Sequence, residues 1–147
     1  MINRLLSFLD ASPVNFLAVA TIEEDLAAAG FKKINPALPF SNMKPGEQFY
    51  VTKNDSSIYA FRLGKKPLGD AGFKIICAHC DSPTFRIKPN PEMLKEGRLV
   101  QLNTEVYGGA ILSTWFDRPL SLAGRVIIKT DNPMRPATRL LHIKRPL

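Results

Sequence analysis

The first part of the chain carries apolar side chains at helical spacing. The leucine and isoleucine residues of 2–9 recur on one face, and this period predicts a first helix. A second helix is predicted over residues 16–29, where Val19 and Leu26 share a face and Gly30 stands at the glycine stop that commonly follows a helix. Two adjoining helices are therefore expected at the start of the chain.

The following segments change to strand-like patterns. Residues 31–47 are rich in proline, lysine and asparagine, which favours a loop. Aromatic and β-branched residues predict strands at 48–52 and 57–63, with a polar turn between them. Residues 73–78, FKIICA, form a continuous apolar run that is typical of a strand buried on both faces. This order of elements predicts an α/β fold for residues 1–90.

Prolines interrupt the pattern after His79. Pro83, Pro89 and Pro91 predict a stretch through which no regular element runs, because proline lacks a backbone N–H. Strand patterns then resume and indicate a second, mostly β unit over residues 91–147. They cover residues 98–108, the apolar tract around 111–112, and residues 123–129 and 139–143.

The composition is that of an ordinary globular domain. Of the 147 residues, 45% are hydrophobic and 22% are charged, so a sizeable core is possible. The apolar runs are too short to cross a bilayer, and the N-terminus lacks the apolar region and cleavage site of an export signal. We therefore expect a cytoplasmic protein with no membrane partner, in which Cys77 and Cys80 are free thiols.

The basic charge balance raises the question of an anionic partner. The formal net charge is +7, and a basic surface can bind nucleic acid. Lysine and arginine are spread along the chain in short pairs, without a dense basic run or interleaved aromatic residues. We expect no nucleic-acid partner. Steeply salt-dependent retention on a nucleic-acid column would indicate one.

The segment richest in reactive side chains is IICAHCDSPTFRIKP, residues 75–89. It puts His79 and Asp81 directly after the predicted buried strand, at the edge where open α/β sheets form ligand sites. His79 could offer one ring nitrogen to a metal while Asp81 holds the other. From spacing alone, a loop histidine capped by an acid is the commoner arrangement. A C-x-x-C zinc site is disfavoured, because no second cysteine pair exists to complete four ligands.

Five blocks of the chain, in order, resemble the M18 (aspartyl aminopeptidase) family of zinc-dependent aminopeptidases. The most specific is TWFDR followed by LAGRV, and together the blocks extend over nearly the whole chain. They are FLDASPVNFLAVATIEEDLAAAGF (8–31), QFYVTKNDSSIYAFRLG (48–64), AHCDSPTFRIKPNPE (78–92), EVYGGAILSTWFDRPLSLAGRV (105–126) and LLHIKRP (140–146).

This resemblance implies roles for particular residues. His79 matches the first ligand of a two-zinc site, and Asp81 matches the catalytic supporting acid that orients it. The implied reaction removes an N-terminal residue, preferably aspartate or glutamate, from peptide substrates by means of zinc-activated water and a carboxylate general base. Asp117 is not assigned to the metal, and His142 is expected to be structural.

The resemblance also implies an architecture. Residues 1–90 correspond to the N-terminal part of a three-layer α/β zinc-peptidase domain. Residues 91–147 correspond to the start of an inserted, mostly β dimerisation or oligomerisation domain, which the block at residues 115–118 helps to open. A homo-oligomer is therefore expected.

Some residues depart from the family pattern. None of them is His79, so they bear on substrate preference and subunit packing more than on metal binding. Cys80 stands where threonine is usual, Leu17 where histidine is common, Asn15 where proline is common, Ala110 at the third glycine of the YGGG motif and Pro119 at an acidic position.

The remaining ligands and the general base of the family lie downstream of residue 147. We therefore expect the isolated chain to be an incomplete fragment that binds zinc weakly and lacks activity. The alternative is a non-catalytic interaction module that keeps the scaffold without the ligands.

Overall fold

The computed structural model describes residues 1–147 and confirms the two predicted helices. Helix α1 covers Ile2–Ala11 and helix α2 covers Asn15–Ala28. Gly30 follows α2 with a φ of +83°, a left-handed conformation that glycine adopts without steric cost. Arg4 of α1 forms an ion pair of 3.0 Å with Asp25 of α2. Local sequence signals therefore place both helices correctly.

A small mixed sheet follows and packs against α2. Its strands are β1 (Lys32–Lys33), β2 (Gln48–Lys53) and β3 (Ser57–Arg62), in the order β1-β2-β3. The predicted strands at 48–52 and 57–63 are confirmed as the antiparallel pair β2–β3, and β1 adds a parallel edge within the predicted loop. Only four residues are buried, namely Ala18 and Val19 of α2 and Phe49 and Tyr50 of β2.

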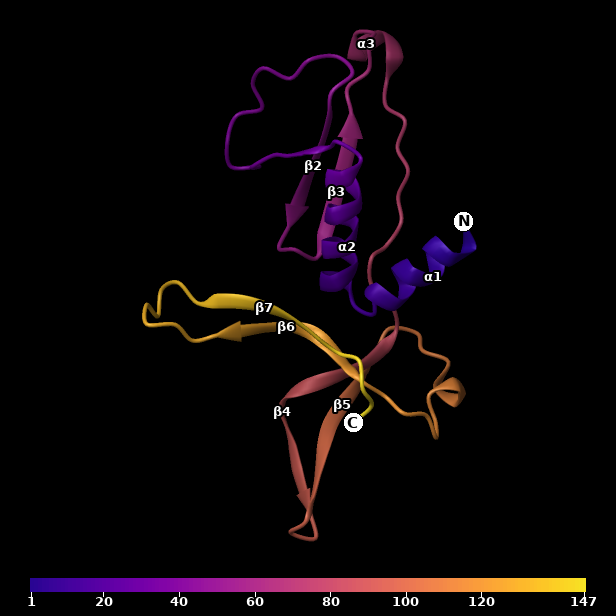
Figure 1. The fold of residues 1–147 in the computed structure, drawn as a ribbon, viewed down its shortest axis with the longest axis vertical. Coiled ribbons are helices and arrows are strands. Elements are labelled where there is room, and N and C mark those ends of the chain that lie inside the picture. Colours follow the sequence, from indigo (N-terminus) through magenta and orange to yellow (C-terminus); the bar gives the residue numbers. More distant parts are fainter.

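The predicted buried strand at residues 73–78 is wrong as an element of this chain. The segment runs as unpaired extended chain from α3 (Leu68–Ala71) towards β4 (Figure 1). Residues 73–82 make no backbone–backbone hydrogen bond, and Ile75 and Ile76 are 76% and 99% exposed. The physical reason is that a strand needs a neighbour to pair its N–H and C=O groups, and no other segment of this chain lies beside it.

The expectation that no regular element crosses the prolines is also wrong. Strand β4 (Thr84–Lys95) runs through Pro89 and Pro91 and pairs with β5 (Leu99–Tyr107). The register shifts between Ile87 and Glu92, so the prolines lie in an irregular stretch of the ladder. Proline is tolerated at bulges and at sheet edges, because no ladder hydrogen bond from its nitrogen is needed there.

The last hairpin agrees with the predicted strands. Strands β6 (Leu122–Ile128) and β7 (Ala137–Ile143) are antiparallel and in continuous register. The tract around 111–112 does not form a strand but leads into the 3-10 turn η1 (Leu112–Thr114). The domain boundary near residue 91 stays a prediction, although β4 passes through it. None of the helices has both the length and the apolar character needed to cross a membrane.

The chain has helices and sheets, which agrees with the α/β class, but its elements are spread apart. The sheet with α2 and the two hairpins extend in different directions (Figure 1). The accessible surface is 12420 Å², whereas folded monomers of this mass expose about 7500 Å². The sizeable core that the composition allows is therefore not formed in this chain: most of the hydrophobic residues lie on surfaces that no other element covers.

Candidate metal centre

The two residues predicted to form a metal centre lie together on the extended segment before β4. The Nδ1 atom of His79 lies 2.7 Å from the backbone carbonyl oxygen of Asp81 and 3.2 Å from its carboxylate Oδ1. Both neighbours are acceptors, so neutral His79 carries its hydrogen on Nδ1 and donates it to Asp81. The Nε2 atom then keeps a free lone pair, which is the form of imidazole that binds a metal ion.

Asp81 is held in turn by a residue from a different element. The hydroxyl of Tyr107, at the end of β5, donates a hydrogen bond of 2.6 Å to Oδ2 of Asp81. This bond lowers the pKa of the Asp81 carboxyl below its ordinary value of 3.8, with help from a backbone N–H and from His79. The same bond raises the pKa of Tyr107 above 10.0. Asp81 is therefore a carboxylate at neutral pH.

Tyr107 was missed by the sequence analysis. It lies 26 residues from Asp81 in the chain, and the H-x-D spacing gives no indication of it. The signal that could have found it is the hairpin register: Tyr107 pairs with Thr84, which follows Asp81 closely. The sequence analysis expected no strand in the stretch of Pro83, Pro89 and Pro91, so it could not supply that register.

The residues present can provide one metal ligand but do not form a complete site. No group of three or more histidine, cysteine, aspartate or glutamate side chains is arranged to hold a metal ion. Cys77 is exposed and Cys80 is half-buried, and both are unpaired thiols. His79 is 81% exposed at its side chain, so its Nε2 atom is open to ligands from outside this segment. The fit to zinc is that of a single nitrogen donor.

The other residues weighed in the sequence lie elsewhere. His142 is in β7, paired with Ala123, which agrees with the strand predicted there; its structural role stays a prediction. Asp117 has a φ of +54° in the turn after η1, and the neighbouring Arg118 donates to the carbonyl of Thr114 at 3.2 Å. Neither His142 nor Asp117 takes part in the His79–Asp81 contact.

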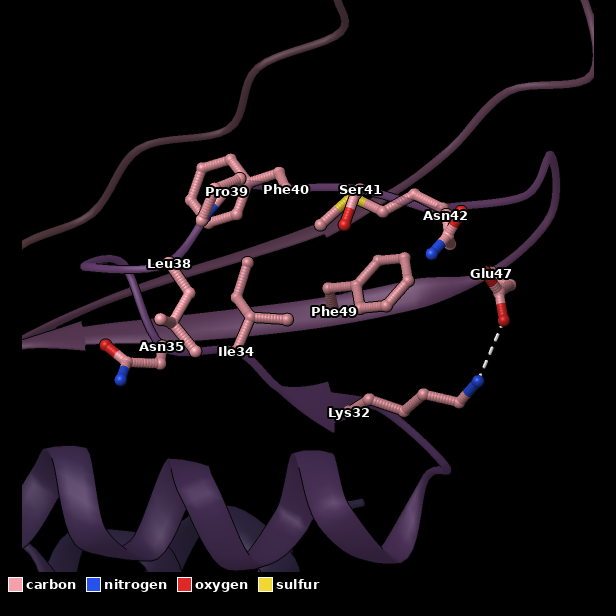
Figure 2. Close-up of a pocket in the computed structure, with 11 residues that line it drawn as sticks. Lys32, Ile34, Asn35, Leu38, Pro39, Phe40, Ser41, Asn42, Glu47 and Phe49 are labelled. Carbon is pink, nitrogen blue, oxygen red and sulfur yellow. Dashed lines mark hydrogen bonds and ion pairs between the residues drawn. The ribbon is translucent and has the colours of Figure 1, made fainter.

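A shallow pocket of about 270 Å³ lies in the N-terminal part of the chain, between β2 and the loop before it. Figure 2 shows Pro39 and Phe40 of this loop above Phe49 of β2, and the ion pair between Lys32 and Glu47 at one side. Its lining contains no histidine or cysteine and none of residues 77–81. The pocket is therefore separate from the candidate metal centre.

Comparison with known proteins decides the family. Residues 8–147 match the family model described as aminopeptidase I zinc metalloprotease (M18). The chain belongs to the M18 family. This result confirms the resemblance inferred from the sequence blocks, and it identifies zinc as the metal associated with the family.

An M18 relative shows how much of the family is represented here. A protein of Clostridium novyi described as a probable M18 family aminopeptidase 2 is 51% identical over 145 residues, which cover 99% of this chain but 33% of the relative. The chain therefore spans about a third of the length of this curated M18 relative.

Solved M18-like structures share the fold. A structure of the Ape4 and Nbr1 complex matches 97% of this chain and 27% of its own, with a TM-score of 0.89 and 43% identity. The mApe1 dodecamer of S. cerevisiae matches 94% of this chain and 32% of its own, with a TM-score of 0.84. At 24% identity, the second likeness concerns the fold alone.

Proposed function

We propose that this chain supplies the first metal ligand, His79, to a zinc-dependent M18 aminopeptidase. The observation that carries the proposal is the His79–Asp81 contact, which directs Nδ1 to two acceptor oxygens at 2.7 and 3.2 Å and leaves Nε2 free. A metal-binding histidine commonly gives its other N–H to a carboxylate or a carbonyl oxygen, and here Asp81 offers both. Membership of a zinc metalloprotease family supports the same role.

The proposed reaction is hydrolysis of the N-terminal residue of a peptide, with acidic residues preferred. Zinc at such a centre, with two ions in the complete enzyme, supplies a Lewis acid and lowers the pKa of bound water. The residues of this chain position the ligand: Asp81 fixes the ring orientation and the tautomer of His79. Asp81 thus acts on the metal through His79.

The isolated chain is proposed to lack this activity. One imidazole cannot hold a catalytic zinc ion, since such sites use three protein ligands and an open position, and no cluster of three candidate ligands exists in this chain. The other ligands and the general base must come from polypeptide that corresponds to the remaining two thirds of the M18 relatives. We further propose a cytoplasmic homo-oligomer, in which residues 1–90 belong to a three-layer catalytic domain and residues 91–147 to an inserted oligomerisation domain.

A reconstitution experiment tests this function. The chain is refolded with a second polypeptide that carries the unmatched two thirds of the C. novyi relative, and zinc binding and cleavage of N-terminal aspartyl, glutamyl and leucyl peptides are measured. We expect activity from the mixture and none from either part. His79→Gln should abolish zinc-dependent activity, and the control His142→Gln should retain it. Activity that survives His79→Gln would refute the role of His79.

A non-catalytic scaffold, which keeps the fold without the metal ligands, is the alternative function. The same experiment separates the two proposals. A stable complex without zinc-dependent hydrolysis would support the scaffold. Stoichiometric zinc with activity in the 147-residue chain alone would contradict the proposed division of the site.

A further inference from the structure

Tyr107 connects the candidate metal ligand to the β4–β5 hairpin. Its hydroxyl lies 2.6 Å from Oδ2 of Asp81, while Oδ1 of the same carboxylate lies 3.2 Å from Nδ1 of His79. Each carboxylate oxygen thus has one side-chain partner, and the three side chains form a continuous chain of contacts. A hydroxyl bound to a carboxylate at this distance is a charge-assisted hydrogen bond, which is stronger than a neutral one.

The segment that carries His79 and Asp81 has little other support. Residues 73–82 make no backbone–backbone hydrogen bond, and the side chains of His79 and Asp81 are 81% and 43% exposed. Backbone structure therefore does not fix the Asp81 carboxylate. The Tyr107 hydroxyl is the side-chain contact that ties it to a regular element, because Tyr107 is paired in register with Thr84 at the end of the hairpin.

We propose that Tyr107 is a positioning residue: by holding the Asp81 carboxylate, it keeps His79 in the Nδ1–H tautomer that presents Nε2 to a metal. The benefit of this positioning rests on the proposed function, in which His79 binds zinc. The positioning itself can be measured in the chain without metal.

The tautomer of His79 is directly measurable. The chain has two histidines, so long-range proton–nitrogen correlation spectra of the imidazoles contain two ring systems, and His142 is an internal control. The 147-residue chain is studied without metal at a pH where the imidazoles are neutral. We expect Nδ1–H to dominate at His79. Because Tyr107→Phe removes the hydrogen bond that holds the Asp81 carboxylate beside Nδ1, it should lower the ratio of Nδ1–H to Nε2–H at His79 by about tenfold.

Tyr59→Phe is the matched control, because Tyr59 is an exposed tyrosine of β3 whose hydroxyl has no hydrogen-bond partner within the chain. It should leave the ratio unchanged. An unchanged ratio in Tyr107→Phe, or an equal change in Tyr59→Phe, overturns the proposal. If Tyr107→Phe prevents the β4–β5 hairpin from forming, the unmodified chain still tests the proposal. A His79 that is mostly in the Nε2–H tautomer in that chain overturns the proposal.

The reconstituted enzyme separates this proposal from the proposed function. There, Tyr107→Phe should lower zinc affinity, by less than the roughly 10-fold to 100-fold cost of losing a direct partner of the ligand such as Asp81. Should His79 hold the Nδ1–H tautomer while the reconstituted protein binds no zinc through it, positioning stands and the metal-ligand role fails. If zinc binds through His79 with the same affinity in Tyr107→Phe, the metal-ligand role of His79 stands and the positioning role of Tyr107 fails.

Discussion

The guanidinium of Arg125 lies over the ring of Phe16, 4.2 Å from its centroid. The same guanidinium donates a hydrogen bond of 2.7 Å to the backbone carbonyl of Asn54, in the turn between β2 and β3. One side chain of β6 thus contacts both α2 and the first sheet. Arg125 belongs to the LAGRV block, so a family motif has a structural role here in joining the last hairpin to the N-terminal unit.

Replacement of Arg125 by alanine should loosen this attachment. A cation–π contact at a partly exposed site contributes about 0.5–1 kcal/mol, and a hydrogen bond adds about 1 kcal/mol. Amide hydrogen exchange in β6 and in the β2–β3 turn should therefore become about tenfold faster. Arg139→Ala is the control, because Arg139 lies in the paired strand β7 and its side chain has no partner within the chain. Equal effects of the two variants would contradict the assigned role.

Gly108→Ala should disturb the candidate metal centre from a distance. Gly108 has a φ of +74°, and a Cβ there would lie 3.4 Å from Cα of Pro83. A left-handed conformation costs a non-glycine residue about 1–2 kcal/mol, so the end of β5 that carries Tyr107 should shift. Spectra of His79 and exchange at Thr84 should report the change. Gly109→Ala, which meets open space without a positive φ, should have little effect, and similar spectra for both variants would refute this prediction.

The loop before β2 should open in acid. The side chain of Lys32 and the backbone N–H of Lys44 hydrogen-bond to the carboxylate of Glu47 and lower its pKa below 4.5. A folded-state pKa below the ordinary value means that the contact stabilises the loop above pH 4.5 and that this stabilisation is lost as the pH falls through the lower, folded-state value.

The Lys44 amide resonance should report this transition. We expect a midpoint below 4.5, and Glu47→Gln should remove the transition. Glu24→Gln in α2 is the control, because Glu24 has no ion-pair partner and should leave the titration of Lys44 unchanged. A midpoint at or above the ordinary value would show that the Lys32 contact does not form in solution.

The sequence predicted the structure well where an element depends on interactions between residues close together in the chain. The helices and the β2–β3 hairpin were predictable because their signals, such as Gly30 and the polar turn before Ser57, act between near neighbours. The unpaired state of residues 73–78 was not predictable, because strand pairing depends on neighbouring segments and not on the apolar pattern of the strand itself. Tyr107 was not found for a related reason: its contact with Asp81 depends on the register of β4 and β5, including the irregular stretch around Pro89.

The unpaired segment at residues 73–78 gives the last prediction. Its apolar residues alternate on both faces, and Ile76 is 99% exposed, so Ile76→Lys should change the stability of this chain by less than about 0.5 kcal/mol.

In the reconstituted complex the same residue should be covered, because a strand with two apolar faces is stable when it is paired at its edges and packed above and below. A buried, unpaired charge costs several kcal/mol, so Ile76→Lys should weaken association with the second polypeptide by more than about 100-fold. Sedimentation equilibrium measures the association, with Met134→Lys as a control, because Met134 in the β6–β7 turn is also largely exposed, at 88%. If the Ile76→Lys chain binds the second polypeptide as tightly as the unmodified chain does, residues 73–78 are not part of the contact. The second polypeptide would then cover the apolar surfaces of the hairpins instead.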